Sequence, residues 1–159
     1  MTVDLDPVSS LILAEAGDLA ETVLVVDDRH GVLSRAALDR GARVLAACDD
    51  LRDERELPDG VTVVDLTAAP NLSEVGTVLW RLPKAVAAVE DVAELLALRC
   101  RPDVRVLGGA RVKHLVHAMN DALMEQADLP AIDGEDPLSS TGLRLDREAD
   151  LWRSVAMRQ

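Results

Sequence analysis

The sequence predicts an α/β fold with a doubly wound, mostly parallel sheet flanked by helices. Two observations predict it. Short runs of Val, Leu and Ala alternate along the chain with polar or helix-periodic segments, which is the pattern of strand–helix–strand units. These runs are apolar at successive positions, as is typical of parallel strands buried on both faces. Connections between such strands are right-handed in nearly all sheets, so helices are expected on both faces.

The first third of the chain supplies two helices and two strands. A helix is expected after Pro7, because proline favours the first turn and apolar residues follow at helical spacing. Residues 22–27 form an apolar run that ends at an acid, and they predict the first strand. Residues 32–40 predict a helix that ends at Gly41, and residues 43–48 predict the second strand.

The middle of the chain continues this alternation. Residues 49–60 are polar and predict a connection that contains a helix, and residues 61–66 predict the third strand. The run 77–82 predicts the fourth strand, which Pro83 stops. A periodic apolar pattern over 84–98 then predicts a long amphipathic helix.

The rest of the chain contains a fifth strand and a polar tail. Residues 104–107 predict that strand, Gly108–Gly109 predicts a turn after it, and residues 112–126 predict a helix. Residues 1–128 are therefore interpreted as the α/β domain. Residues 129–159 begin with a turn-rich stretch and are interpreted as a loop followed by an edge strand or hairpin, or as a linker.

Composition and charge exclude several classes of function. The 159 residues suffice for one domain, and their formal net charge of −12 argues against unaided binding to DNA or another phosphate backbone. The chain has no Phe or Tyr on which bases could stack. Positive charge is concentrated in residues 99–117, which carry five Lys or Arg against one acid. Only this segment is expected to present a basic face.

Cysteine usage and the N-terminal sequence predict a cytoplasmic protein. Cys48 and Cys100 lack CxxC spacing and histidine-rich surroundings, so we expect reduced thiols and no metal site. No apolar run reaches the roughly 18 residues of a membrane span, and the N-terminus lacks the basic start of a signal peptide. No membrane partner is therefore expected.

The turn after the first strand lies where nucleotide-binding folds have a glycine-rich turn, but it is poor in glycine. A nucleotide-type pocket needs glycines there, because the backbone must approach the ligand, and an acid after the second strand to hold the ribose. Asp49 or Asp50 supplies the acid, but residues 27–31 contain one glycine. We expect their side chains to fill the space. Asp28, Gly31 and Asp49 are thus interpreted as the remnant of a pocket that binds no cofactor.

Three motifs together carry a resemblance to a known family. They are Asp27–Asp28 followed by Gly31, Pro83–Lys84 after the fourth strand, and Gly109-Ala110-Arg111-Val112-Lys113 after the fifth. In this order, over about residues 20–126, they resemble the N-terminal half of the bacterial ribosomal RNA guanine-N2 methyltransferases, the "methyltransferase small" group. Asp27 replaces the asparagine that is usual in that family, and residues after 128 carry no matching motif.

The resemblance implies a Rossmann-like methyltransferase fold. Proteins of this family resemble two tandem methyltransferase folds: a degenerate N-terminal copy, and a C-terminal copy with the S-adenosylmethionine site and an Asn-Pro-Pro motif. Residues 1–128 would be the degenerate copy, and residues 129–159 would lead toward the C-terminal catalytic domain. In place of Asn-Pro-Pro this chain has Arg81-Leu82-Pro83-Lys84, and leucine cannot accept a hydrogen bond from a target amine.

The implied function is support of a catalytic domain. This domain would orient the catalytic half of an S-adenosylmethionine-dependent rRNA (guanine-N2)-methyltransferase and would help to position rRNA, which it would bind weakly. S-adenosylmethionine is expected in the catalytic half and not in this domain. No catalytic residue is predicted, because His30 and His117 have no nucleophile near them in the sequence.

Four residues are candidates for RNA contact. Arg111, Lys113 and His114 follow the fifth strand, at the edge where open α/β sheets place their ligands. Positive charge in the first turn of a helix opposes the helix dipole, which favours a partner for this cluster. Lys84 follows Pro83 at the corresponding edge. A solvated helix start explains the same residues without a partner.

A phosphoacceptor receiver-like signalling domain is the alternative. Asp27 and Asp28 would then bind Mg²⁺, Asp65 would accept the phosphoryl group, and Lys113 would hold the phosphate. Lys113 lies six residues beyond Leu107 instead of directly after the strand, and no Ser or Thr ends the fourth strand. These departures favour the methyltransferase interpretation.

Overall fold

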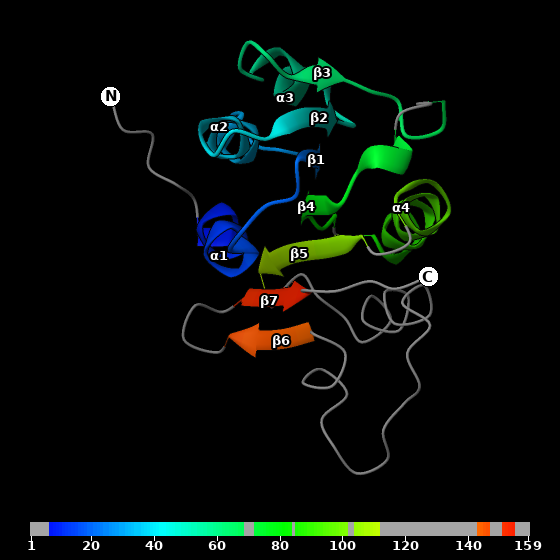
Figure 1. The fold of residues 1–159 in the computed structure, drawn as a ribbon. Coiled ribbons are helices and arrows are strands. Elements are labelled where there is room, and N and C mark those ends of the chain that lie inside the picture. The colour runs from blue at the N-terminus through cyan, green and yellow to red at the C-terminus, as the bar shows by residue number, and fades with distance from the viewer. Residues whose placement is uncertain are drawn as a thin grey trace.

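The computed structural model describes residues 7–68, 72–83, 85–101, 104–111, 143–146 and 151–154. Within these ranges, a seven-stranded sheet of order β3-β2-β1-β4-β5-β7-β6 forms the centre (Figure 1). The helices are α1 (Pro7–Ala16), α2 (Val32–Asp39), α3 (Leu51–Arg55) and α4 (Val86–Arg99), with a short 3-10 helix η1 (Leu72–Glu74). The strands are β1 (Thr22–Val26), β2 (Arg43–Ala47), β3 (Thr62–Val63), β4 (Thr77–Arg81), β5 (Arg105–Arg111), β6 (Leu143–Asp146) and β7 (Leu151–Ser154).

The sheet is parallel from β3 through β5 and ends in an antiparallel pair. β1 pairs in parallel with β2 on one side and with β4 on the other, with Val26 opposite both Ala47 and Trp80. β3 and β5 extend this parallel part at its two ends. β7 runs antiparallel to β5, and β6 antiparallel to β7. The predicted doubly wound, mostly parallel α/β fold is confirmed.

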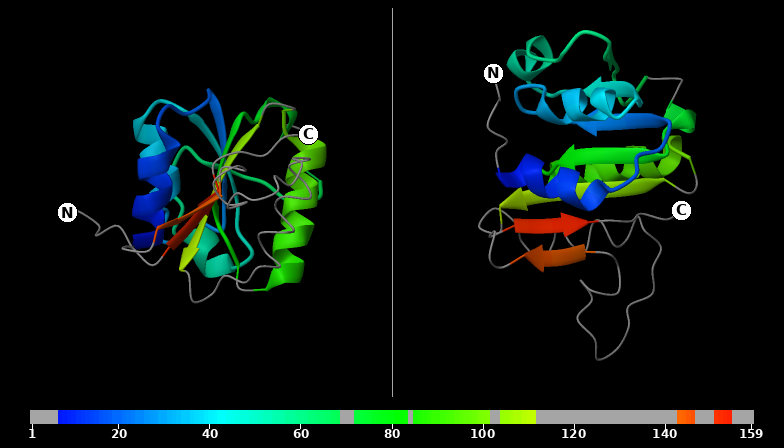
Figure 2. Two further views of the ribbon diagram at one scale, coloured as in Figure 1. Left: turned by 90° about the horizontal axis from the view of Figure 1, so that it is seen from below. Right: turned by 60° about the vertical axis from the view of Figure 1, so that its left-hand side comes forward.

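Helices cover both faces of the sheet. Figure 2 shows α1 and α2 on one face and α4 on the other. Val23 and Val25 of β1 belong to the apolar core shared with α1 and α2, whereas Leu24 and Val26 belong to the core shared with α4. All four side chains are buried. The unbroken apolar run therefore reflects a strand that packs on both faces.

The strand order decides between the two fold alternatives. In the observed sheet β1 lies between β2 and β4, which gives the order 3-2-1-4-5. A receiver domain has the order 2-1-3-4-5 instead. The receiver alternative is therefore wrong. In the observed order the winding reverses between β1 and β4, and the carboxyl ends of these strands flank the crevice where such folds place their ligands.

β3 and α4 differ from the predicted bounds. β3 spans two residues rather than the predicted 61–66, because it is an exposed edge strand and the chain turns soon after it. The turn is fixed by Asp65, whose Oδ1 accepts a hydrogen bond from the backbone N of Thr67 at 2.9 Å. α4 begins at Val86 rather than at 84, since Ala85 is still extended with φ −89° and ψ 127°.

Gly108 and Gly109 do not form the predicted turn, because β5 continues through both to Arg111. A Cβ atom on Gly108 would lie 3.1 Å from Cδ2 of Leu82, and one on Gly109 would lie 2.9 Å from Cγ1 of Ile12. The two glycines therefore let Leu82 approach β5 on one face while α1 packs closely on the other.

Some predictions concern residues beyond the described part of the chain. The helix expected at 112–126 lies there, as do Lys84, Lys113, His114 and His117. Among the helices that the structure does describe, none is long and apolar enough to cross a membrane.

Candidate functional site

The turn between β1 and α2 is built on left-handed backbone. Asp27, His30 and Gly31 have φ angles of 54°, 56° and 67°. Glycine adopts such angles freely, whereas other residues do so at a cost that is smallest for Asn and Asp. The turn thus takes up a glycine-like conformation with one glycine, and its two other left-handed positions carry side chains.

Asp28 closes the N-terminus of α2 from inside the protein. Its side chain is fully buried, Oδ1 accepts a hydrogen bond from the backbone N of Leu33 at 3.0 Å, and Oδ2 accepts one from that of Ser34 at 2.9 Å. Burial raises the pKa of the Asp28 carboxyl, and the hydrogen bonds from Ser34 and Leu33 oppose that rise. In nucleotide-binding folds these helix N–H groups bind the ligand's anion. Here a side chain of the chain itself occupies them.

The loop after α3 covers the outer side of this turn. A Cβ atom on Gly31 would lie 2.6 Å from the carbonyl oxygen of Glu56 and 3.0 Å from Cδ of Pro58. Nδ1 of His30 and Oε2 of Glu56 form a hydrogen bond on the surface. Gly31 is therefore needed for packing as well as for its backbone angle.

A cavity of about 610 Å³ lies beside the turn, at the carboxyl ends of β1, β2 and β3. Val26, Val64 and Leu66 contribute apolar wall from the strand side. Part of the opposite wall comes from α4, where Ala88, Asp91, Val92 and Leu95 follow at spacings of three and four and so share one helix face. Five acidic residues also line the cavity: Asp27, Asp49, Glu54, Asp65 and Asp91.

This cavity changes the expectation for the turn. Of the three remnant-pocket residues, Asp49 lines the cavity, whereas Asp28 and Gly31 do not. From residues 27–31, Asp27 alone reaches the cavity lining. The turn side chains therefore do not fill all of the space at the strand ends, and the expectation that they would is corrected.

The two acids after β2 have different surroundings. Asp50 caps α3, since its Oδ1 accepts from the backbone N of Arg52 at 2.8 Å, and its carboxylate pairs with the same arginine. The bond with Arg52 lowers the pKa of Asp50. Asp49 instead lies at the cavity, and its backbone N donates to Oδ1 of Asp27 at 3.0 Å. Of the two acids, Asp49 is therefore the one that lines the cavity.

The cavity surroundings shift the pKa of Asp27. Its pKa is raised mainly by burial, with the nearby carboxylates of Asp49 and Asp53 adding to the rise. Cys48 in the same lining has its pKa raised to about 11, again by burial first and then by Asp27 and other carboxylates. For both groups burial is the main cause of the shift, and nearby carboxylates add to it.

Leu82 directly follows β4 and precedes Pro83. Leu82 is half-buried, packs on the core under α4, and donates its backbone N to the carbonyl oxygen of Gly109 at 2.9 Å. Its side chain offers no hydrogen-bond acceptor.

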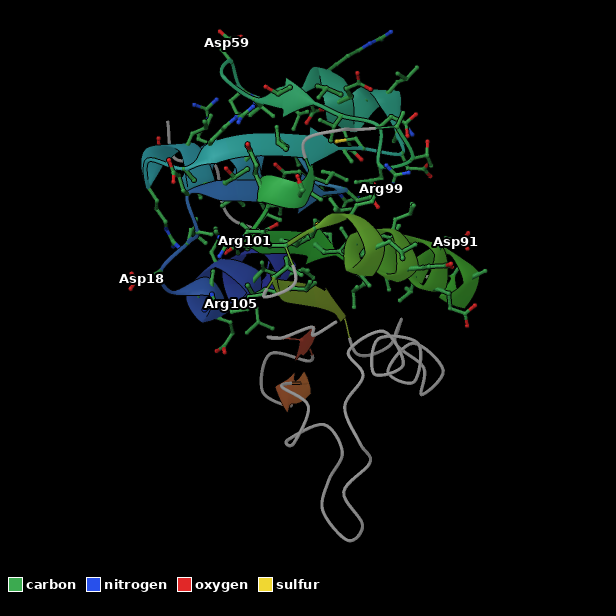
Figure 3. All side chains as sticks on the ribbon, turned by 45° about the vertical axis from the view of Figure 1, so that its right-hand side comes forward. Asp18, Asp59, Asp91, Arg99, Arg101 and Arg105 are labelled. Atoms are coloured by element: carbon green, nitrogen blue, oxygen red, sulfur yellow. The ribbon has the colours of Figure 1, made fainter. Side chains whose placement is uncertain are left out.

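Two described arginines of the basic segment, Arg101 and Arg105, lie away from the cavity, whereas Arg99 is close enough to Asp65 to help lower the pKa of that carboxyl. The guanidinium of Arg105 donates to the carbonyl oxygen of Ala16, and the backbone N of Arg101 donates to that of Val75 at 3.1 Å. Figure 3 shows Arg101 and Arg105 on the side of Asp18, at the amino ends of the strands. These two residues therefore make their hydrogen bonds at the amino-terminal edge of the sheet.

The RNA-contact candidates stay predictions. Arg111 is the last residue of β5, and only its backbone is described. Lys84, Lys113 and His114 lie outside the described residues.

Sequence reasoning missed the acidic cavity itself. Asp27, Asp49 and Asp65 each follow a parallel strand shortly after its end, and such ends meet at one edge of the sheet. That recurring pattern could have identified three of the five carboxylates. Glu54 and Asp91 come from helices, and no sequence signal points to them.

Comparison with known proteins gives a family and a relative. The family model of the RLMG N-terminal domain matches residues 9–128. Ribosomal RNA large subunit methyltransferase G of Pseudomonas syringae pv. tomato is 32% identical over 124 residues, which cover 71% of this chain and 33% of that protein. The chain thus spans about a third of the length of the curated relative that it matches.

Solved structures give the fold. The T. thermophilus 16S rRNA N2 G1207 methyltransferase, in complex with AdoMet and guanosine, aligns with a TM-score of 0.71 at 17% identity, over 98% of this chain and 44% of that one. An RNA methyltransferase from Salinibacter ruber, in complex with S-adenosyl-L-homocysteine, aligns with a TM-score of 0.59 at 18% identity, over 99% and 95% of the two chains. At these identities the likeness establishes a Rossmann-like methyltransferase fold.

Proposed function

This chain belongs to the RLMG N-terminal domain family, and from that membership we propose that it is the non-catalytic N-terminal domain of an S-adenosylmethionine-dependent rRNA (guanine-N2)-methyltransferase. The rest of such an enzyme holds the methyl donor and the Asn-Pro-Pro motif. This domain stabilises and orients that catalytic half and helps to position rRNA. The full enzyme would have to take the target guanine out of its stack to reach the amine.

The observation that carries the proposal is the closed end of α2. A methyl donor presents a carboxylate that needs backbone N–H groups, and Asp28 already occupies those of Leu33 and Ser34. Its neighbour Asp27 lines the cavity beside this closed end. Leu82 in the amine position supports the same conclusion, since it cannot hold a target amine.

Donor stoichiometry in the full-length parent enzyme tests this assignment. Isothermal titration with S-adenosyl-L-homocysteine should give one equivalent per chain, because only the catalytic half has a site. Replacing asparagine in the Asn-Pro-Pro motif by alanine should abolish methyl transfer to rRNA, whereas Asp49→Asn in this domain should leave it intact. Two equivalents per chain, or loss of transfer in Asp49→Asn, would refute the assignment.

The proposed rRNA contact has its own test. Arg111→Glu with Lys113→Glu should weaken binding of an rRNA fragment by the full-length enzyme by about tenfold, because two phosphate contacts are reversed in sign. Arg29→Glu with Arg35→Glu is the matched control, since both residues are exposed and lie near α2. Equal binding by the two double variants, measured by fluorescence anisotropy, would remove Arg111 and Lys113 from the interface.

A further inference from the structure

We propose that the cavity at the carboxyl ends of β1, β2 and β3 binds an aliphatic polyamine, a linear organic cation with several charges. The inference does not depend on the proposed function, because it rests on the cavity's size, walls and charge. Its volume of about 610 Å³ is in the range of small-molecule sites, which are roughly 300–1,000 Å³.

The charge of the lining selects a cation. Five acidic residues line the cavity, and its described lining contains no Lys, Arg or His; the nearby Arg99 acts on one of the five, Asp65. Phosphorylated ligands are disfavoured twice, since the carboxylates repel them and Asp28 occupies the helix N–H groups that would bind a phosphate. A ligand of opposite charge would relieve the repulsion between Asp27 and Asp49 that contributes to the raised pKa of Asp27.

The placement of the acidic residues on separate elements favours an extended cation over a metal ion. They come from three strand ends, from α3 and from α4. Within the described residues, no group of three His, Cys, Asp or Glu side chains is placed to hold a metal ion. A divalent ion needs its oxygen ligands within about 2.6 Å of one point. A polyamine instead presents ammonium groups several bonds apart, so it can pair with carboxylates that lie on different walls.

The apolar walls complement the rest of such a ligand. Val26, Val92 and Leu95 provide aliphatic surface between the carboxylates. Methylene chains between ammonium groups bury against such surface as lysine stems do, at about 0.8 kcal/mol for each fully buried CH₂. A single inorganic cation gains nothing from these walls.

Titration of the 159-residue chain with spermidine tests the proposal. Isothermal calorimetry should show one saturable site, and amide shifts in an NMR titration should be centred on Asp27, Asp49 and Asp91. Mg²⁺ at matched ionic strength should produce neither effect. Heat without saturation, or equal shifts with Mg²⁺, would overturn the proposal.

Two double variants separate a built site from general charge attraction. Asp49→Asn with Asp91→Asn removes two cavity carboxylates, and Asp18→Asn with Asp59→Asn removes two that do not line the cavity. All four residues are exposed, so both variants are expected to fold. The cavity variant should bind spermidine about tenfold more weakly than the control variant, as two lost charge contacts would give. Equal weakening in both variants would overturn the proposal.

A parallel titration with S-adenosylmethionine keeps the two conclusions apart. Binding of spermidine without binding of the donor supports both the polyamine site and the proposed function. Binding of the donor contradicts the proposed function, whereas failure of spermidine contradicts only this inference.

Discussion

Asp27 and Asp28 are adjacent in the sequence and have opposite surroundings in the fold. Asp28 is fully buried, and both of its oxygens accept hydrogen bonds from the start of α2. Asp27 is partly exposed, accepts one hydrogen bond from Asp49, and lines an open acidic cavity. The comparison teaches that a buried carboxylate can close the start of a helix while the space beside it, at the strand ends, stays open.

Gly31→Ala should cause the largest loss of stability, because it strains the turn between β1 and α2. The left-handed backbone costs about 1–2 kcal/mol with a Cβ present, and the contact of 2.6 Å with the carbonyl oxygen of Glu56 adds about 1–3 kcal/mol of overpacking. Gly17→Ala is the control, because Gly17 has a φ of 56° and open space around it. Urea unfolding should show a clearly larger loss for Gly31→Ala. Equal losses would mean that the loop after α3 does not hold the turn.

The negative charge of the cavity should change the rate at which Cys48 is alkylated. Its pKa is raised from 9.0 to about 11 by burial and by the carboxylates around it, so its thiolate at neutral pH is about 100-fold scarcer than that of an unperturbed thiol. Alkylation of a Cys100→Ser variant should accelerate with a midpoint near pH 11. Adding Asp27→Asn should lower that midpoint. A midpoint near 9 in both proteins would contradict a negative potential in the cavity.

Asp28→Ala should destabilise the domain by about 1–2 kcal/mol, as loss of a helix cap does. The backbone N–H groups of Leu33 and Ser34 lose their acceptor in this variant. Asp28→Asn keeps one acceptor oxygen and should lose less. The free energies of unfolding at pH 7 should decrease in the order wild type, Asp28→Asn, Asp28→Ala. An alanine variant as stable as wild type would show that the cap contributes nothing.

Asp27→Asn should give the smallest effect, a gain in stability of no more than about 1 kcal/mol at pH 7. Because burial raises the pKa of Asp27 above its ordinary 3.8, the folded state holds this proton more tightly than the unfolded state. The free energy of unfolding therefore falls as pH rises from 3.8 through the raised value. Asparagine does not titrate, so the variant lacks this pH-dependent fall in the free energy of unfolding. Its side chain still accepts the hydrogen bond from the backbone N of Asp49, and asparagine tolerates left-handed backbone.

The pH profile checks the Asp27 prediction. The advantage of Asp27→Asn over wild type should vanish below about pH 4 and reach its full size at neutral pH. Asp59→Asn, which removes an exposed carboxylate outside the cavity, should show no such trend. An advantage that does not depend on pH would mean that burial of the Asp27 charge is not its source.

The fold could be predicted from the sequence because its signals are local. The runs at 22–27, 43–48 and 77–82 became β1, β2 and β4 to within one residue at each end. Burial on both faces explains this agreement, since every position of such a strand must be apolar. The family was predictable for a related reason, because its motifs follow strand ends in a fixed order.

The site was less predictable because it depends on contacts between distant segments. Gly108 and Gly109 suggest a turn until the positions of Leu82 and Ile12 on the two faces of β5 are known. Steric reasoning about residues 27–31 likewise could not show that Asp28 points into α2. The cavity that results is a property of five segments, and no one of them predicts it.

The most direct test of the account is titration of S-adenosylmethionine into this 159-residue chain. With the N–H groups of α2 occupied by Asp28, calorimetry should show no saturable binding up to about 1 mM donor. Micromolar affinity, with amide shifts at Leu33, Ser34 and Asp49, would contradict the account, because it would mean that the closed end of α2 still admits the donor.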